Sequence, residues 1–155
     1  KIFQGTIREN IAYGKPNASI EEIKQAAELS FANTFIEKLP DGYDTYISNS
    51  DMLSEGEVQL LNIARIMLIK PPILILDEAT SNIDLLTEDM IKKAILELTS
   101  NSTSIIIAHR LSTIKNCDFI VFIEDGNIVE VGTHDELINK KGAYYNMYKS
   151  QFNLI

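Results

Sequence analysis

The stretch of residues 53–84 constrains this sequence most strongly, because it places a helix start, a helix stop and a strand directly after one another. Ser54 can cap a helix, with Glu57 as the reciprocal partner that a capping box requires three residues later. Apolar residues then follow at helical spacing as far as Ile69. Two prolines in residues 70–72 end this helix, since proline lacks the backbone N–H that a continuing helix needs.

A short apolar run, Ile73–Leu76, comes next and ends in two adjacent carboxylates, Asp77 and Glu78. The run is too short for a helix and is bounded by proline, so it predicts a buried strand. Open α/β sheets place their sites at the carboxyl ends of strands, and adjacent side chains on a strand point in different directions. One carboxylate can therefore face a cation such as Mg²⁺ while the other faces an attacking water. The alternative interpretation is an exposed turn at the end of a strand.

A second predicted strand, residues 104–108, ends in the same way at His109. If the two strands are neighbours, His109 and Glu78 share one edge of the sheet, and the imidazole can bond a phosphate or the carboxylate. Taken alone, His109 is more typical of a structural histidine. The parallel with Asp77 and Glu78 favours a site.

Gly56 lies in the first turn of the helix, where glycine costs about 1 kcal/mol relative to alanine. That cost is accounted for if a ligand must approach the backbone closely, and a phosphate at the helix N-terminus fits this requirement. Glu55 and Glu57 oppose this interpretation, because their negative charges suit the helix dipole but repel an anion. A good helix start without any ligand therefore stays open as the alternative.

Helices dominate the first part of the chain, and strands alternate with helices in the second. Residues 6–69 predict capped helices with no convincing strand, and residues 43–51 predict a loop. Further on, β-branched runs separated by helices favour a mostly parallel sheet covered by helices. We expect a helical subdomain over residues 1–70 and the C-terminal half of an α/β core over residues 71–155. The predicted helices are 6–14, 20–31, 34–39, 54–69, 84–99, a turn at 111–115, 133–141 and 143–152, and the strands are 73–76, 104–108, 119–123 and 127–131.

Side-chain caps and one tight turn complete this prediction. Asp125-Gly126 predicts a hairpin turn between the last two strands. The predicted N-caps, besides Ser54, are Thr6, Ser19, Asn33 and Thr133, with Glu9, Glu22 and Glu136 as capping-box partners of the first, second and fourth.

Composition limits the class of protein. The net charge of −8 argues against DNA or RNA as the main partner, because phosphate backbones are bound by basic surfaces. The one cysteine, Cys117, excludes an internal disulfide framework, and the two histidines lack the spacing of zinc ligands. No apolar run approaches the length of about 20 residues that a membrane-spanning helix needs, so we expect the domain itself to be soluble.

The phosphate-binding loop of P-loop enzymes, G-x-x-x-x-G-K-[ST], does not occur in these 155 residues. The chain begins without methionine, and Ile2-Phe3 has no partner run before it. We therefore expect that further residues precede Lys1 in the natural protein, and that the chain alone does not bind a nucleotide tightly.

The order of these motifs resembles that of the nucleotide-binding domains of ATP-binding-cassette (ABC) exporters of the multidrug, lipid or peptide type. Leu53–Glu57 looks like the signature motif, Ile73–Glu78 like the Walker B strand, Ser81–Asp84 like the D-loop and His109 like the switch histidine. Flanking segments also resemble these domains, so the likeness spans the whole chain. It implies part of a P-loop NTPase core of RecA-like type, beginning just after the position of the Q-loop.

The resemblance implies a role for each matching residue. Asp77 would help to hold Mg²⁺, Glu78 would be the general base toward the attacking water, and His109 would contact the γ-phosphate of ATP and organise Glu78. Ser54 and Gly56 would grip ATP that is bound to a partner domain. The full set of implied nucleotide-contacting residues is Ser54, Glu55, Gly56, Glu57, Ser81 and Asp84, of which Ser81 and Asp84 would span the interface between two domains.

The same resemblance implies partners and a location. A second nucleotide-binding domain, identical or different, would complete the ATP sandwich, and its closure would drive a transmembrane domain. Residues 19–39 and 43–51 would face the coupling helices of that membrane domain. The chain would lie at the cytoplasmic face of the cell membrane, and no nucleic acid is implied.

The sequence departs from the family pattern at residues 48–51 and at Glu57, where the signature motif usually ends in glutamine. Glu57 adds a negative charge where a phosphate should bind. This leaves open a non-hydrolytic or degenerate-site regulatory domain of a heterodimeric exporter. A soluble ABC-type ATPase of DNA maintenance is a further alternative, which the flanking segments 6–14 and 126–137 and the acidic charge disfavour.

Overall fold

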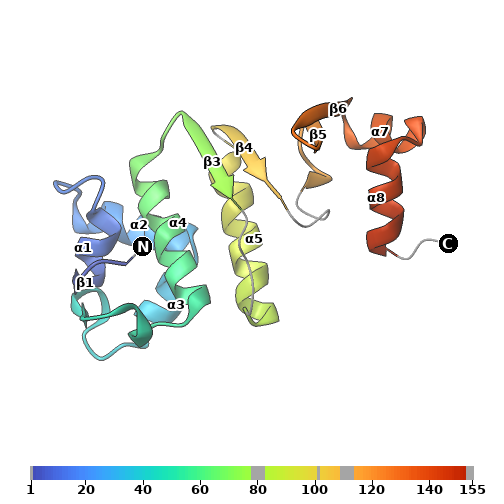
Figure 1. Cartoon of the computed structure of the whole chain (residues 1–155). Coiled ribbons are helices and arrows are strands. Elements are labelled where there is room, and N and C mark those ends of the chain that lie inside the picture. Colours follow the sequence, from blue (N-terminus) through green and yellow to red (C-terminus); the bar gives the residue numbers. More distant parts are fainter. Residues whose placement is uncertain (1, 78–82, 101, 109–113, 153–155) are drawn as a thin grey trace. The chain divides into compact units, whose positions relative to one another are not determined.

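The structure is a computed structural model of the chain and describes residues 2–77, 83–100, 102–108 and 114–152 (Figure 1). The chain divides into two compact units, one of residues 1–75 and 80–105 and the other of residues 76–79 and 106–155. The helices are α1 (Ile7–Ala12), α2 (Ile20–Leu29), α3 (Asn33–Ile36), α4 (Glu55–Ile69), α5 (Leu85–Thr99), α7 (His134–Lys140) and α8 (Ala143–Phe152), with 3₁₀ turns η1 (Gly42–Asp44) and η2 (Ser50–Met52). The strands are β1 (Gly5–Thr6), β2 (Tyr46–Ile47), β3 (Ile73–Asp77), β4 (Thr103–Ile107), β5 (Ile120–Glu124) and β6 (Asn127–Gly132).

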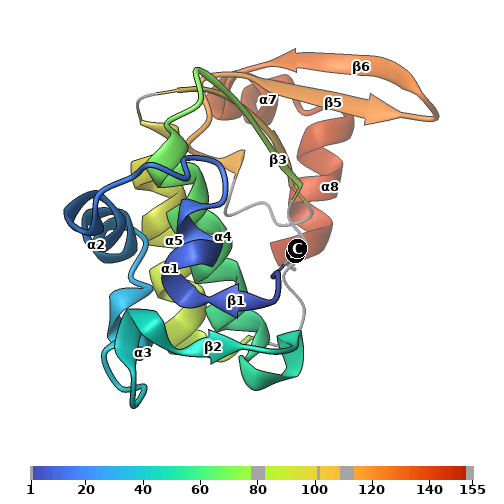
Figure 2. The ribbon, with the colours of Figure 1, turned by 90° about the vertical axis from the view of Figure 1, so that its left-hand side faces the viewer.

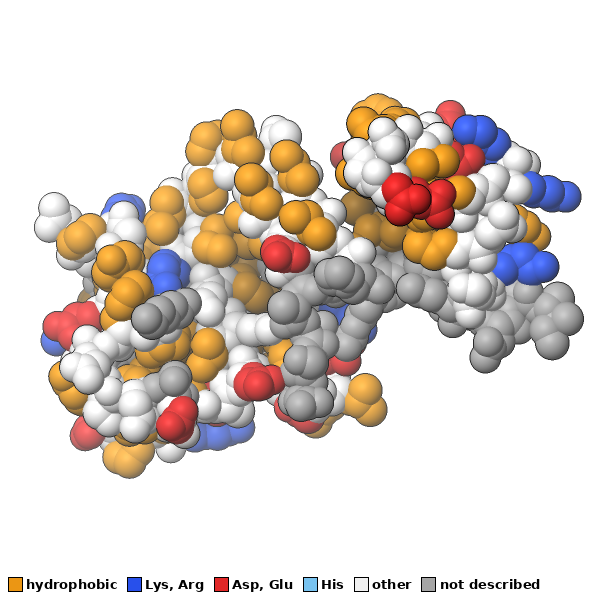
Figure 3. Space-filling view, in the orientation of Figure 1, with side chains coloured by type: hydrophobic (Ala, Val, Ile, Leu, Met, Phe, Trp, Pro, Cys, Tyr) orange, Lys and Arg blue, Asp and Glu red, His pale blue; other side chains and the backbone are white. Residues whose placement is uncertain are grey.

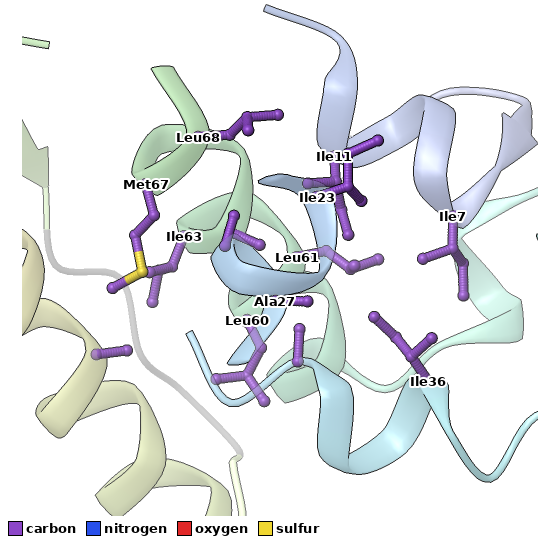
Figure 4. Packing of buried hydrophobic residues seen from close by; sticks show 14 of the residues in the cluster. Ile7, Ile11, Ile23, Ala27, Ile36, Leu60, Leu61, Ile63, Met67 and Leu68 are labelled. Atoms are coloured by element: carbon purple, nitrogen blue, oxygen red, sulfur yellow. The ribbon is translucent and has the colours of Figure 1, made fainter. Parts of the chain in front are cut away.

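Helix α4 forms the centre of the first unit, with α1, α2 and α5 packed against it (Figures 1 and 2). A helix that is apolar on several sides needs neighbours on all of them. Figure 4 shows the α4 side chains interleaved with those of α1, α2 and α3. The buried residues of α4 are Gly56, Leu60, Leu61, Ile63, Ala64, Met67 and Leu68. Because each fully buried large apolar side chain contributes about 1.5–3 kcal/mol, this core fixes α4 and therefore the position of its first turn.

Helix α5 packs on α4 through Ile91 and Ala94, which are buried in the same core. The compact units therefore group α5 with the helices that precede it in the chain. The predicted division into a helical subdomain (residues 1–70) and an ATPase core (residues 71–155) is a functional division and not one of packing contacts, so it stays a prediction.

Capping boxes start four of the helices in the part of the chain that the structure describes. In each box the N-cap hydroxyl accepts the N–H of the glutamate at N3, and the glutamate carboxylate accepts the N–H of the N-cap residue. These four predictions from the sequence are confirmed. The pairs are Thr6 with Glu9, Ser19 with Glu22, Ser54 with Glu57, and Thr133 with Glu136.

The predicted cap at Asn33 is wrong. Asn33 is the first residue inside α3, and the N-cap is Ala32, which offers no side-chain hydrogen bond. Ala32 already has a helical backbone, with φ −64° and ψ −29°, whereas a capping side chain needs an extended residue. The predicted end of α4 at Ile69 is confirmed, and Lys70 takes the left-handed conformation there, with φ 51°.

The strands form three two-stranded sheets among the described residues. The prediction of no strand before residue 69 is wrong, because Gly5 and Thr6 pair antiparallel with Ile47 and Tyr46. A two-residue strand is too short to show the alternation by which a strand is recognised in a sequence.

Strands β3 and β4 are hydrogen-bonded neighbours. The N–H of Thr103, at the start of β4, donates to the C=O of Pro72, just before β3, at 3.1 Å. The two strands therefore begin side by side and run in the same direction, as their arrows do in Figure 1. The α/β class is confirmed, and a single, mostly parallel sheet stays a prediction.

The second unit contains the predicted β5–β6 hairpin, in which Asp125 and Gly126 have φ 49° and 76°. Two positive φ angles in a two-residue loop match the right-handed twist of the flanking strands. Its core contains Ile120, Leu137 and the fully buried Tyr144. Helices α7 and α8 both pack against β6.

Candidate functional site

Ser54 stands at the start of α4 with an extended backbone, φ −66° and ψ 159°. Its N–H donates to Glu57 Oε2 at 2.8 Å, and its hydroxyl donates to the same oxygen at 2.9 Å. The N–H of Glu57 donates in return to Ser54 Oγ at 3.3 Å. Both donors of Ser54 thus end on one carboxylate, while the N–H groups of Glu55 and Gly56 have no carbonyl partner inside the helix.

Gly56 is buried because the first turn of α4 lies directly against the first turn of α5. A Cβ placed on Gly56 would clash with Thr87 Cγ2 and would lie 3.3 Å from both Thr87 Cβ and Ile83 Cγ2. Close helix packing therefore accounts for this glycine without a ligand. The presence of glycine at position 56 is therefore no longer evidence that a phosphate approaches the backbone there.

Thr87 and Ile83 are the residues of this region that the sequence did not single out. Gly56 did indicate a close neighbour, because glycine in a helix is costly unless something packs against the backbone. The sequence does not tell whether that neighbour is a ligand or another helix. The structure identifies a helix.

Asp84 is the N-cap of α5 and is exposed. Its carboxylate accepts the N–H of Leu86 at 3.1 Å and that of Thr87 at 3.0 Å. These bonds, above all the one from Thr87, hold the pKa of Asp84 below its ordinary value. Because Thr87 also packs on Gly56, the starts of α4 and α5 form one structural element that contains five predicted site residues: Ser54, Glu55, Gly56, Glu57 and Asp84.

Asp77 is the last residue of β3, where its side chain is exposed, while Leu74 of the same strand is buried. An exposed carboxylate at a strand end can supply one oxygen ligand to a cation such as Mg²⁺. No cluster of three or more His, Cys, Asp or Glu side chains that could hold a metal ion occurs among the described residues.

Glu78, Ser81 and His109 lie outside the described residues. The sequence predicted that Glu78 and His109 share one edge of the sheet if the strands before them are neighbours. Strands β3 and β4 are neighbours, so this condition is met. Since β3 and β4 run in the same direction, Asp77 and Ala108 lie at the same end of this sheet. The contact between Glu78 and His109 stays a prediction.

Arg65 ties the signature-like helix to the start of the chain, which the sequence did not predict. Its Nε donates to the C=O of Asn10 at 2.9 Å, and its guanidinium lies 5.3 Å from the ring centroid of Phe3 and 5.6 Å from that of Tyr13. These two rings stack with their centroids 4.3 Å apart. Cation–π contacts of this kind contribute about 0.5–2 kcal/mol, so they add to the core in fixing α4.

No helix in the described part of the chain has the length and apolar character that crossing a bilayer requires.

Comparison with known proteins gives the class. Residues 2–81, just over half of the chain, match the family model described as ABC transporter. The chain belongs to the ABC transporter family.

Individual relatives agree with this assignment. The chain is 53% identical over 152 residues to the uncharacterized ABC transporter ATP-binding protein YfiC of Bacillus subtilis (strain 168), covering 97% of this chain and 25% of that protein. It is 52% identical over 151 residues to a putative multidrug export ATP-binding/permease protein of Staphylococcus aureus (strain NCTC 8325 / PS 47), covering 97% of this chain and 26% of that protein.

Among solved structures, a bacterial Atm1-family ABC exporter with ATP bound matches with a TM-score of 0.85 and 42% identity. The match covers 97% of this chain and 26% of the exporter chain. The chain thus spans about a quarter of the length of the relatives that it matches.

Proposed function

We propose that this chain is the C-terminal part of the nucleotide-binding domain of an ABC exporter, and that the complete protein binds and hydrolyses ATP to drive export. The observation that carries the proposal is the match of 97% of the chain, at 53% and 52% identity, to an ABC transporter ATP-binding protein and to a putative multidrug export ATP-binding/permease protein. The signature-like helix start and the strand ending in Asp77 occur within it in family order.

In this proposal the end of β3 serves ATP bound by the chain's own domain. Asp77 supplies one oxygen ligand to Mg²⁺, which neutralises phosphate charge when it is bound. Glu78 accepts the proton of the attacking water, and His109 orients Glu78 and contacts the γ-phosphate. The exposed position of Asp77 and the neighbouring, parallel strands β3 and β4 support these roles.

The joined starts of α4 and α5 serve ATP bound by a partner domain. Ser54 and the N–H groups of the first turn of α4 are suited to hold a phosphate, because a helix N-terminus presents donors and a positive dipole end. Glu55, Gly56 and Glu57 lie around the same phosphate, and Ser81 and Asp84 contact the partner across the interface. A second nucleotide-binding domain and a transmembrane domain are the partners, at the cytoplasmic face of the cell membrane.

The exposed faces of the strands support a P-loop core with a larger, mostly parallel sheet. Parallel sheets normally have both faces covered, so that their strands are apolar on both sides. Leu74 of β3 is buried on one face, whereas Ile73, Ile75, Ile105 and Ile107 are 50–65% exposed. Figure 3 shows hydrophobic side chains gathered over β3 and β4. A covering layer in the complete domain would remove this apolar surface from water.

Replacement of Glu78 by glutamine in the complete exporter tests the catalytic proposal. The amide keeps the size of the side chain but accepts no proton, so ATP should still bind while steady-state hydrolysis falls at least 100-fold, at the low end of what a general base contributes. Glu124→Gln, at the exposed end of β5, is the matched control and should leave turnover unchanged. Unchanged hydrolysis in the Glu78 variant would contradict the assignment of Glu78 as the general base.

A further inference from the structure

We propose that Glu57 is a built-in competitor of the nucleotide's terminal phosphate, holding the hydroxyl and the N–H of Ser54 until the phosphate displaces it. The inference rests on the proposed function, in which Ser54 contacts ATP held by the partner domain. It adds a regulatory role for the carboxylate at position 57, which sets how readily the signature-like motif engages the nucleotide.

The hydrogen bonds at Ser54 carry this proposal. Its N–H and its O–H both donate to Glu57 Oε2, at 2.8 and 2.9 Å. A serine hydroxyl has a single proton to donate. While that proton is directed to Glu57, it is not available to a phosphate oxygen, so phosphate binding through the hydroxyl requires the bond to Glu57 to break.

The charge of Glu57 makes this competition stronger than the same contact with an amide. Hydrogen bonds to an ionised acceptor are roughly twice as strong as bonds between neutral groups. A glutamine at this position can keep the capping box, because its carbonyl oxygen accepts the same N–H. It lacks the charge, so it holds the hydroxyl less tightly and does not repel an approaching phosphate.

The first turn of α4 has little freedom to relieve the competition by moving. Gly56 packs against Thr87 and Ile83 of the neighbouring helix start, and the next turn carries the buried Leu60 and Leu61. The phosphate must therefore replace Glu57 at Ser54 by rotation of the glutamate side chain.

The test measures ATP hydrolysis by the complete exporter against ATP concentration. Glu57→Gln should lower KM for ATP about fivefold to tenfold, because the competing bond loses roughly half its strength. Glu136→Gln is the matched control, since Glu136 makes the equivalent capping bonds at the start of α7. It should leave KM unchanged. An unchanged KM in the Glu57 variant, with its unfolding temperature preserved, overturns the inference.

A double-mutant cycle tests whether Glu57 acts through the hydroxyl. In a Ser54→Ala background the gain from Glu57→Gln should fall to about half or less, because the contested hydroxyl proton is gone while the backbone N–H and the charge repulsion remain. An undiminished gain in that background would mean that charge repulsion alone operates, which also overturns the inference. Failure of the proposed function is distinguishable, since it would appear as undiminished hydrolysis in the Glu78→Gln exporter.

Discussion

Replacing Gly56 by alanine decides whether this glycine serves helix packing or ligand approach. The added methyl group would point at Thr87, whose Cγ2 it would overlap, and would lie 3.3 Å from Ile83 Cγ2. Packing therefore predicts a less stable protein even when no nucleotide is present. Ligand approach predicts the opposite, because alanine is the better helix former.

Two opposing terms set the magnitude. Alanine gains at most about 1 kcal/mol over glycine in helix propensity, and less in the first turn, where Gly56 lies. Forcing a methyl group into a well-packed contact costs about 1–3 kcal/mol. Thr87 is branched at Cβ and begins a helix, so its side chain has few alternative rotamers with which to yield. The expected net loss is about 1–2 kcal/mol.

Thermal unfolding of the complete nucleotide-binding domain, followed by circular dichroism without nucleotide, measures this loss. For a domain of about 150–250 residues it corresponds to a fall in Tm of roughly 2–8 °C. Thr87→Ser removes the overlapped methyl group and should recover part of the loss in the double variant. A Tm that is unchanged or higher in Gly56→Ala would refute the packing explanation and favour close approach of a ligand as the reason for the glycine.

Four further outcomes follow from the structure. Leu61→Ala should cost about 2–5 kcal/mol of unfolding free energy by denaturant titration, because Leu61 is 1% exposed, whereas Leu85→Ala, at 83% exposure, should change it by less than about 0.5 kcal/mol. Thr133→Ala should cost about 1 kcal/mol in the same assay, through loss of the cap of α7. The N–H of Tyr144 donates to the Glu130 carboxylate and lowers its pKa below the ordinary 4.5. The stability that this carboxylate contributes is therefore present above pH 4.5 and is lost as the pH falls through the lowered pKa. Tm measured against pH should accordingly fall more steeply in the wild type than in Glu130→Gln below about pH 4.5. Calorimetry of the isolated 155-residue chain should show no micromolar ATP binding, since the sequence holds no phosphate-binding loop.

Local features of the fold were predictable from the sequence because their causes are local. A capping box needs two residues three positions apart, so Ser54 with Glu57 and Thr133 with Glu136 could be read directly. The hairpin at Asp125-Gly126 has the same character. The cap at Asn33 failed because the backbone before it is already helical, which depends on how the preceding turn packs.

Features that depend on distant neighbours were not predictable. The pairing of β1 with β2 joins residues about 40 positions apart through two-residue strands. The contact of Gly56 with Thr87 joins two helix starts separated by a strand. The residues of the candidate site could be located in the sequence by their resemblance to a family. That Ser54 directs both of its donors to Glu57, and that Thr87 fills the space beside Gly56, could be seen only in the structure.

The rigidity of the α4 start has a consequence for nucleotide affinity. A motif on a mobile loop would have to be ordered on binding, at about 1–2 kcal/mol for each backbone residue fixed. The first turn of α4 is already ordered by its buried neighbours and by its contact with α5. Binding at Ser54 is then an exchange of hydrogen-bond partners, Glu57 for phosphate, in which the difference between two acceptors sets the affinity. Exchange of this kind explains why a single change from carboxylate to amide at position 57 should shift KM while the unfolding temperature of the domain stays the same.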